Sequence, residues 1–244
     1  MTDLGWVGVV RHGESTGNVK REEAEAAGLD VIDIAERDAD VPLSPLGEQQ
    51  AAAVGRWLAS LPSGRRPDVV VCSPYQRALS TAWLAVDEIG YQPVRLVDER
   101  LRDRELGVLD LLTARGVANR HPDELVRKER LGKFYYRPPG GESWADVALR
   151  LRSLLGDLER RHQGERVLLF AHEMTAYLLR YLLEGVPEKD LLALARNTVV
   201  ANGSVTSWVR EGSGFRLEHE HATEHLRDRG VQPTESEDAE TESV

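Results

Sequence analysis

Four side chains that could bind or attack a phosphorus centre follow short apolar runs of the chain. They are Arg11, His12, Arg77 and His172. The apolar runs before them are 6–10, 69–72 and 167–171. Short, β-branched apolar runs are typical of buried strands. Because ligands of parallel sheets bind outside the carboxyl ends of the strands, we expect these four side chains to gather at one sheet edge.

A phosphate monoester fits this group of side chains. It carries about two negative charges at neutral pH, and arginine binds it with a planar fork of donors. Arg77 lies in the predicted first turn of a helix, where free N–H groups and the positive dipole end favour an anion. Gly13 and Gly17 would let backbone N–H groups approach phosphate oxygens. Each motif alone is weak, since such arginines are usually solvated, but their placement after three strands favours phosphate binding.

Helices are predicted between these strands. Ser44-Pro45 and Ser73-Pro74 each resemble a helix start, because serine caps a helix and proline suits its first position. Ser143 and Asp146 form a capping-box-like start, and apolar residues then recur at helical spacing up to Leu158. We expect a further helix over 175–184.

The alternation of strands and helices predicts an α/β fold. We expect a three-layer sandwich with a mostly parallel central sheet and helices on both faces. A weaker strand is predicted over 94–97, and 204–209 with 215–219 resemble a terminal hairpin. Residues 1–221 are expected to form one domain, with 108–140 as an insertion or lid.

The chain has 244 residues and a net charge of −10, which argues against binding to nucleic acid or anionic membranes. Half of that charge lies in 232–244, which holds five acids and no base, and we predict that 222–244 is a disordered acidic tail. The single cysteine, Cys72, allows no intrachain disulfide. The N-terminus has no signal-peptide pattern and no apolar run is long enough for a membrane helix, so the expected location is cytoplasmic.

Together these motifs resemble the histidine phosphatase superfamily, which includes cofactor-dependent phosphoglycerate mutases and many phosphatases. The similarity spans roughly residues 6–210 in the order that the family shows. The matching motifs are RHGES at 11–15, LSPLGEQQA at 43–51, CSPYQRALSTA at 72–82, GES at 141–143 and FAHE at 170–173. The pair of RHG and SPxxRAxxTA is highly specific.

The resemblance implies roles for individual residues. His12 would be the nucleophile that becomes phosphorylated, and Arg11, Arg77 and His172 would bind the phosphoryl group. Asn18 stands at a further phosphate-contact position. The remaining predicted binding residues are Gly13, Ser15 and Glu173. The implied mechanism needs no metal and no cofactor, and its partner is a small phosphorylated substrate.

The position of the general acid is less clear from the resemblance. The family places this acid two residues after a leucine and four before a glycine, and in 101–107 the match is Asp103. Most small members have glutamate there. Glu105 is the competing candidate, and a surface ion pair with Arg102 or Arg104 is the structural alternative for either acid.

The neighbourhood of Asn18 favours a phosphatase over a mutase. Mutases have tryptophan before this asparagine, whereas this chain has Gly17, and the basic and aromatic run that follows in mutases is absent. Glu173 replaces the glycine that many members have after the second histidine. It could restrict the pocket, bond a substrate hydroxyl or simply open a helix.

Three alternatives stay open at this point. The first is a phosphoglycerate-mutase-type phosphotransferase, and the second is a non-catalytic module that binds phosphorylated ligands. The third is a metal site at His219, His221 and His225, since 219 and 221 would share one side of a strand and histidines bind zinc. Solvated histidines near a terminus are the more common case. The physiological substrate and the oligomeric state are not predicted.

Overall fold

The computed structural model describes residues 4–235, which form one six-stranded sheet in the order β3-β2-β4-β1-β5-β6. The strands are β1 (Trp6–Arg11), β2 (Val69–Cys72), β3 (Val94–Val97), β4 (Arg166–Ala171), β5 (Val205–Glu211) and β6 (Gly214–Ala222). The strands β3, β2, β4 and β1 are parallel, and β5 and β6 add an antiparallel hairpin beside β1. The three strands that carry the predicted site residues, β2, β4 and β1, are therefore direct neighbours.

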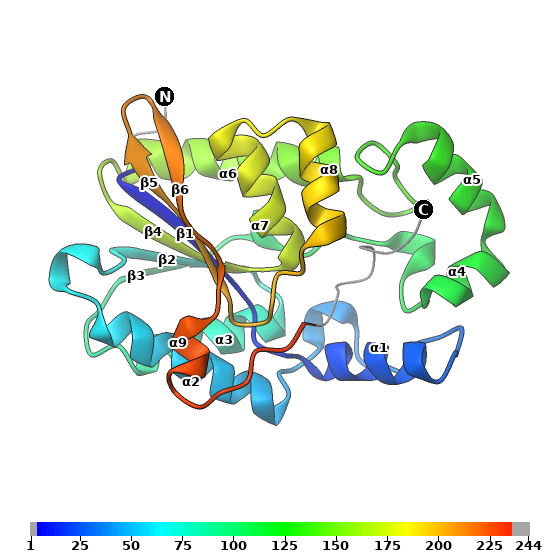
Figure 1. The fold of residues 1–244 in the computed structure, drawn as a ribbon, viewed down its shortest axis with the longest axis horizontal. Coiled ribbons are helices and arrows are strands. Elements are labelled where there is room, and N and C mark those ends of the chain that lie inside the picture. Colours follow the sequence, from blue (N-terminus) through cyan, green and yellow to red (C-terminus); the bar gives the residue numbers. More distant parts are fainter. Residues whose placement is uncertain (1–3, 236–244) are drawn as a thin grey trace.

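Helices cover both faces of the sheet (Figure 1). They are α1 (Thr16–Ala26), α2 (Pro45–Ser60), α3 (Gln76–Asp87), α4 (Ala114–Arg120), α5 (Pro122–Leu131), α6 (Trp144–Arg161), α7 (Glu173–Leu179), α8 (Glu188–Asn197) and α9 (Glu224–Arg227). Residues of α6, α7 and α8 share one buried cluster with the sheet, and residues of α2, α3 and α9 share the other. The predicted three-layer α/β sandwich is confirmed.

The alternation of side chains along β1 explains why one strand serves two cores. Val7 and Val9 point into the cluster with α6, while Trp6 and Val10 point into the cluster with α2 and α3. A strand buried on both faces needs apolar residues at every position, which is the unbroken apolar run seen in the sequence.

Serine caps begin two of the helices as predicted. The Ser44 side chain accepts a hydrogen bond from Gly47 N–H with Pro45 at the first helical position, and Ser143 and Asp146 form a complete capping box. The helix expected at Ser73-Pro74 begins later, at Gln76, without a side-chain cap. The predicted cap is displaced, because the Ser73 hydroxyl lies 2.9 Å from His172 Nε2 and accepts from the N–H of Tyr75, which precedes the helix, and not from an N–H within it.

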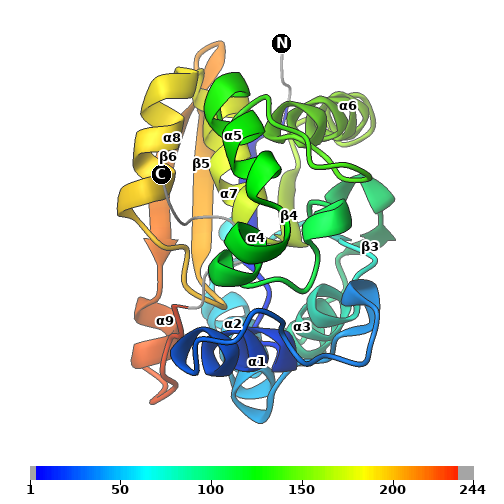
Figure 2. The same ribbon diagram turned by 90° about the vertical axis from the view of Figure 1, so that its right-hand side faces the viewer.

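Some elements were not predicted or differ in detail. The helix α1 buries only Asn18 and Ala24, so it has no apolar stripe to reveal it. The helix expected over 175–184 starts at Glu173 and changes to a π-helical turn at Arg180–Glu184. The segment 108–140 contains α4 and α5, which Figure 2 shows in front of the sheet.

Part of the predicted tail is packed against the domain, which corrects that prediction for 222–235. Leu226 of α9 is fully buried in the cluster with α2, and the side chain of Gln50 donates to the backbone oxygen of Gln232. The apolar residues Leu226 and Val231 precede the acidic run and supply the surface that this segment buries. The remaining predicted tail, 236–244, lies outside the described residues.

Two further observations concern the chain as a whole. Cys72 is buried in β2, where burial raises the pKa of its thiol above the usual range. Within residues 4–235, no helix combines the length and the apolar character that a transmembrane segment requires.

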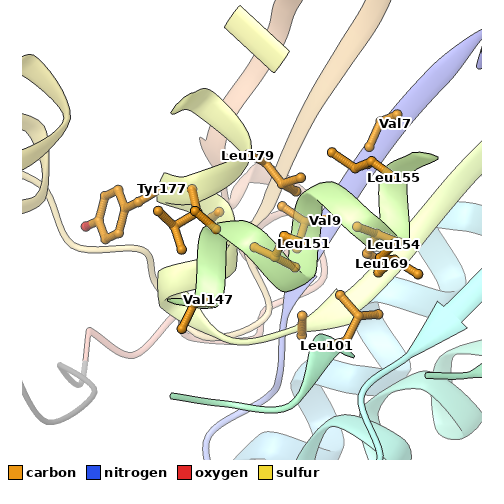
Figure 3. Close-up of a cluster of buried hydrophobic side chains, with 14 of the residues drawn as sticks. Val7, Val9, Leu101, Val147, Leu151, Leu154, Leu155, Leu169, Tyr177 and Leu179 are labelled. Carbon is orange, nitrogen blue, oxygen red and sulfur yellow. The ribbon is translucent and has the colours of Figure 1, made fainter. Parts of the chain in front are cut away.

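The packing of α6 on the sheet yields a stability prediction (Figure 3). Leu151 is 1% exposed and packs in the cluster that contains Val9 and Leu169, whereas Leu149 on the same helix is 61% exposed. Because a buried truncation loses transfer free energy and leaves a cavity, Leu151→Ala should lower the free energy of unfolding by about 2–5 kcal/mol. Leu149→Ala is the matched control and should change it by less than about 0.5 kcal/mol. Urea denaturation measures both, and equal effects would contradict this packing.

Candidate active site

Arg11 and His12 stand at the carboxyl end of β1, on the central part of the sheet. His12 is fully buried, and its backbone N–H donates to Ala171 O of the neighbouring β4 at 2.9 Å. Arg11 is 1% exposed, and its Nη1 donates to Val200 O at 2.5 Å. The sheet and the chain around Val200 thus hold both side chains in place.

The imidazole of His12 has a defined hydrogen on one nitrogen. Its Nδ1 lies 2.8 Å from the carbonyl oxygen of Gly13. Since a carbonyl only accepts, Nδ1 must donate. In the neutral ring the lone pair that can attack phosphorus is then on Nε2.

Gly13 serves close packing at the turn after β1. A Cβ at this position would lie 2.4 Å from Gly47 O, so only glycine fits against the start of α2. Its N–H donates to Thr81 Oγ1 at 3.0 Å. The sequence predicted that the Gly13 N–H approaches a phosphate. In the structure this N–H already donates its hydrogen bond to the hydroxyl of Thr81.

Ser15 and Asn18 form the capping box of α1 and line the adjoining cleft. Asn18 N–H donates to Ser15 Oγ at 3.1 Å, and the Ser15 N–H donates to Asn18 Oδ1 at 3.0 Å. The side-chain amide of Asn202 also lies 3.4 Å from Asn18 Oδ1. Since Asn18 Oδ1 accepts these bonds, any contact of this side chain with an anion would come from its amide nitrogen.

Arg77 comes from the first turn of α3, as predicted, and contacts two carboxylates. Its Nη2 donates to Asp103 Oδ2 at 2.9 Å, and its Nη1 donates to Asp38 Oδ1 at 2.8 Å. Asp38 lies in the 3₁₀ turn Asp38–Asp40 between α1 and α2. No sequence signal pointed to Asp38, because the segment 27–43 matches no motif before Leu43.

His172 follows β4 and lies between a hydroxyl and a carboxylate. Its Nε2 is 2.9 Å from Ser73 Oγ, and its Nδ1 is 3.2 Å from Asp103 Oδ2. The rings of His172 and His12 meet edge to face with their centroids 5.3 Å apart. Ser73 is a site residue that the sequence assigned to a helix cap, although its place directly after β2 was a usable signal.

Asp103 therefore bridges Arg77 and His172. Burial alone would raise the pKa of the Asp103 carboxyl, but its interactions with the imidazole of His172 and the guanidinium of Arg77 outweigh burial and hold that pKa well below its usual range. The backbone N–H of Arg104 also donates to Asp103, at 2.9 Å. Asp103 is therefore a carboxylate at neutral pH.

The competing acid, Glu105, lies farther out. Its side chain accepts a hydrogen bond from Tyr75 OH at 3.0 Å and is exposed at the cleft. Glu173 is buried at the start of α7, where its Oε1 accepts from Val200 N–H at 3.5 Å. The structure thus brings His12, Arg77, Asp103 and His172 together, with Arg11 beside His12 at the end of β1, and places Glu105 on the exposed side.

A cleft opens at this edge of the sheet. Arg77, Asp103, Asn18 and Glu173 line it on the side of the site. Its apolar wall is formed by Ile34, Val41, Leu106, Leu111, Trp144 and Met174. The wall includes 106–111, the start of the segment predicted to be an insertion or lid. The cleft combines a charged end, which includes Arg77 and Asp103, with an apolar wall.

The three C-terminal histidines do not form a metal site. Each lies against a different partner, His219 against Ser207 Oγ, His221 against Thr206 Oγ1 and His225 against Gly203 O. Among residues 4–235, no group of three or more histidines, cysteines or carboxylates could hold a metal ion. The alternative of a histidine metal site is therefore not supported.

Known proteins share this fold and these sequence features. The model of the histidine phosphatase superfamily (branch 1) matches residues 7–223. A 2,3-bisphosphoglycerate-dependent phosphoglycerate mutase of Methylorubrum populi is 32% identical over 189 residues, covering 76% of this chain and 82% of the relative.

Two solved structures are also similar. A mycobacterial glucosyl-3-phosphoglycerate phosphatase has a TM-score of 0.68 and 27% identity, covering 89% of this chain and 99% of that chain. YhfR of Bacillus stearothermophilus has a TM-score of 0.71 and 25% identity, covering 90% and 98%. The parallel sheet with histidines at its carboxyl edge defines the architectural class of the histidine phosphatase fold. The chain belongs to the histidine phosphatase superfamily, whose members are phosphatases or phosphotransferases.

The burial of His225 yields a pH prediction. Burial lowers the pKa of this imidazole to about 4, from an ordinary value of 6.5, while its Nε2 donates to Gly203 O. Between about pH 6.5 and pH 4, His225 is protonated in the unfolded chain but stays neutral in the folded chain. The free energy of unfolding should therefore fall as the pH drops from 6.5 towards 4. The expected share of His225 is roughly 1.4 kcal/mol per pH unit.

Urea denaturation at pH 7.0, 6.0 and 5.0 measures this dependence. His225→Gln should flatten the loss of stability between these pH values, and His219→Gln, whose side chain is 46% exposed, is the matched histidine control. A His225→Gln variant with the wild-type pH dependence would refute the assignment.

Proposed function

We propose that this protein is a phosphatase that hydrolyses phosphate monoesters through a phosphohistidine on His12. The observation that carries this proposal is that Asp103, from the segment after β3, meets the arginine after β2 and the histidine after β4, and that this histidine lies against the one after β1. A phosphoryl group that leaves one oxygen and joins another nucleophile spreads negative charge over its equatorial oxygens. Fixed cations in a buried site stabilise that charge without reorganisation.

The first half of the reaction forms a nitrogen–phosphorus bond. Nε2 of His12 attacks phosphorus, and the ester P–O bond breaks. The Nδ1 hydrogen bond to Gly13 O supports this role, because it fixes the ring orientation and favours the imidazolium charge that develops. Arg11, Arg77 and His172 bind the phosphoryl oxygens, and the amide nitrogen of Asn18 adds a further donor.

Asp103 is proposed to protonate the leaving oxygen and later to accept a proton from water. Its carboxylate is 2.9 Å from Arg77 and 3.2 Å from His172, the two groups that would hold the phosphoryl group. An incoming phosphate shares these cations and adds negative charge, and both effects raise the pKa of Asp103. The acid is thereby protonated when substrate binds, and in the second half water attacks phosphorus as the His12–phosphorus bond breaks.

Hydrolysis is favoured over a mutase reaction by the residues around Asn18 and by the cleft. Gly17 stands where mutases have tryptophan, and the apolar wall suits an organic leaving group. The mycobacterial relative that is similar over 89% of this chain is a phosphatase by its name, while the relative from Methylorubrum populi is a phosphoglycerate mutase. The second candidate is therefore a phosphoglycerate-mutase-type phosphotransferase.

Trapping the intermediate tests the proposed nucleophile. Rapid acid-free quenching after mixing with 4-nitrophenyl phosphate should yield one phosphoryl group per chain, mapped to His12 by mass spectrometry. His12→Ala should retain the fold and lose at least about 10³-fold in turnover, since the attacking atom is gone. His121→Ala, on the loop between α4 and α5, is the control. Turnover of His12→Ala at the wild-type rate would refute the nucleophile.

The same preparation separates hydrolysis from transfer. With 3-phosphoglycerate and 2,3-bisphosphoglycerate, a phosphatase releases inorganic phosphate, whereas a mutase moves label between positions of glycerate without net release. Phosphate release matching the consumption of ester is the expected result. Label exchange that exceeds phosphate release would favour the phosphotransferase.

The general acid is tested through the leaving group. Asp103→Asn should slow the single-turnover phosphorylation of His12 by an alkyl phosphate by about 10²–10⁴-fold, because the alkoxide needs a proton. With 4-nitrophenyl phosphate, whose leaving group needs none, the loss should be under about tenfold. Glu105→Gln is the matched control and should behave like wild type with both esters. A selective loss in Glu105→Gln would transfer the role to Glu105.

A further inference from the structure

The carboxylate of Asp38 contacts the guanidinium of Arg77 in the way that an oxyanion ligand would. Arg77 Nη1 lies 2.8 Å from Asp38 Oδ1, and Nη2 lies 3.3 Å from Asp38 Oδ2, so both carboxylate oxygens meet the guanidinium fork. Nη2 also donates to Asp103. Asp38 and Arg77 both line the cleft. A planar fork facing two oxygens is also how arginine binds a phosphate.

We propose that the carboxylate of Asp38 competes with the phosphoryl group for Arg77 and so determines how tightly the site holds phosphate. The inference rests on the proposed function, in which Arg77 is a phosphoryl ligand. Two carboxylates already offset the single charge of Arg77. Because Asp103 becomes protonated in the proposed reaction, Asp38 remains as the negative charge that a dianion meets at this guanidinium unless its carboxylate moves away.

Asp38, and not Asp103, is the carboxylate that moves away from Arg77. The side chain of Asp38 is 43% exposed, whereas that of Asp103 is 14% exposed. Asp103 is also bound by the Arg104 N–H and lies against His172. Moving Asp38 into water costs little because an exposed carboxylate is readily hydrated, while freeing Asp103 would leave a charge in a site with little water.

The backbone at Asp38 allows this side chain to turn without moving its segment. Arg77 Nη1 also donates to the main-chain oxygen of Asp38 at 2.7 Å. That bond stays when the carboxylate rotates outward. Replacing the side chain should therefore remove the competing charge and leave the 3₁₀ turn in position. The competition weakens the binding of phosphate and favours its release after hydrolysis.

Titration calorimetry with inorganic phosphate tests the inference without requiring turnover. Asp38→Asn keeps the size of the side chain and removes its charge, and we expect it to bind phosphate about tenfold more tightly than wild type, a change of about 1.4 kcal/mol. KM for 4-nitrophenyl phosphate should fall in parallel. Asp40→Asn is the matched control, because Asp40 lies in the same turn, pairs with Arg37 at 2.6 Å and does not line the cleft.

The outcomes separate this inference from the proposed function. Phosphate affinity of Asp38→Asn that equals or falls below that of wild type overturns the competition, and a weaker affinity would make Asp38 a support for Arg77 instead. If the wild type hydrolyses esters in either case, the phosphatase proposal stands. Absence of hydrolysis together with unchanged phosphate affinity in Arg77→Ala would overturn the proposed function itself. Thermal unfolding of each variant verifies that the fold is retained.

Discussion

A buried cation without a partner carries a large free-energy cost. This constraint organises the site. Arg77 is 5% exposed and His172 is fully buried, and one carboxylate, Asp103, lies within 3.2 Å of both. Arg11 is held through the main-chain oxygen of Val200. In the proposed reaction a phosphorylated substrate would take over part of the role of these partners.

The sheet order makes this arrangement possible. The strands β2, β4 and β1 are adjacent and parallel, so three loops that are far apart in sequence end at the same edge. The two cores on either side of the sheet fix these strands, and the Ser15 cap fixes the start of α1 after β1. Glycine at 13 allows the turn after β1 to pack against the start of α2, where any side chain would collide with Gly47 O. Packing and chemistry thus depend on the same backbone positions.

The acidic side chains near the site differ in their surroundings. Asp103 is enclosed between Arg77 and His172, Asp38 is half-exposed on a short turn, and Glu105 is exposed and bonded to Tyr75. In the proposed reaction these three carboxylates would serve different roles because their hydration differs. The family includes both phosphatases and phosphoglycerate mutases, and under the proposed function the apolar wall of the cleft would contact the leaving group.

The sequence by itself determined the three-layer fold and the carboxyl-edge position of Arg11, His12, Arg77 and His172, because apolar runs, serine caps and a motif pair are local signals. It pointed to Asp103 only through spacing, and it misjudged Ser73 and the packed part of the C-terminal segment. Only the tertiary structure decided that Asp103 bridges Arg77 and His172, that Thr81 occupies the Gly13 N–H and that Asp38 reaches Arg77. These contacts join residues from separate loops. Their distances depend on how whole elements pack, which no local pattern of residues encodes.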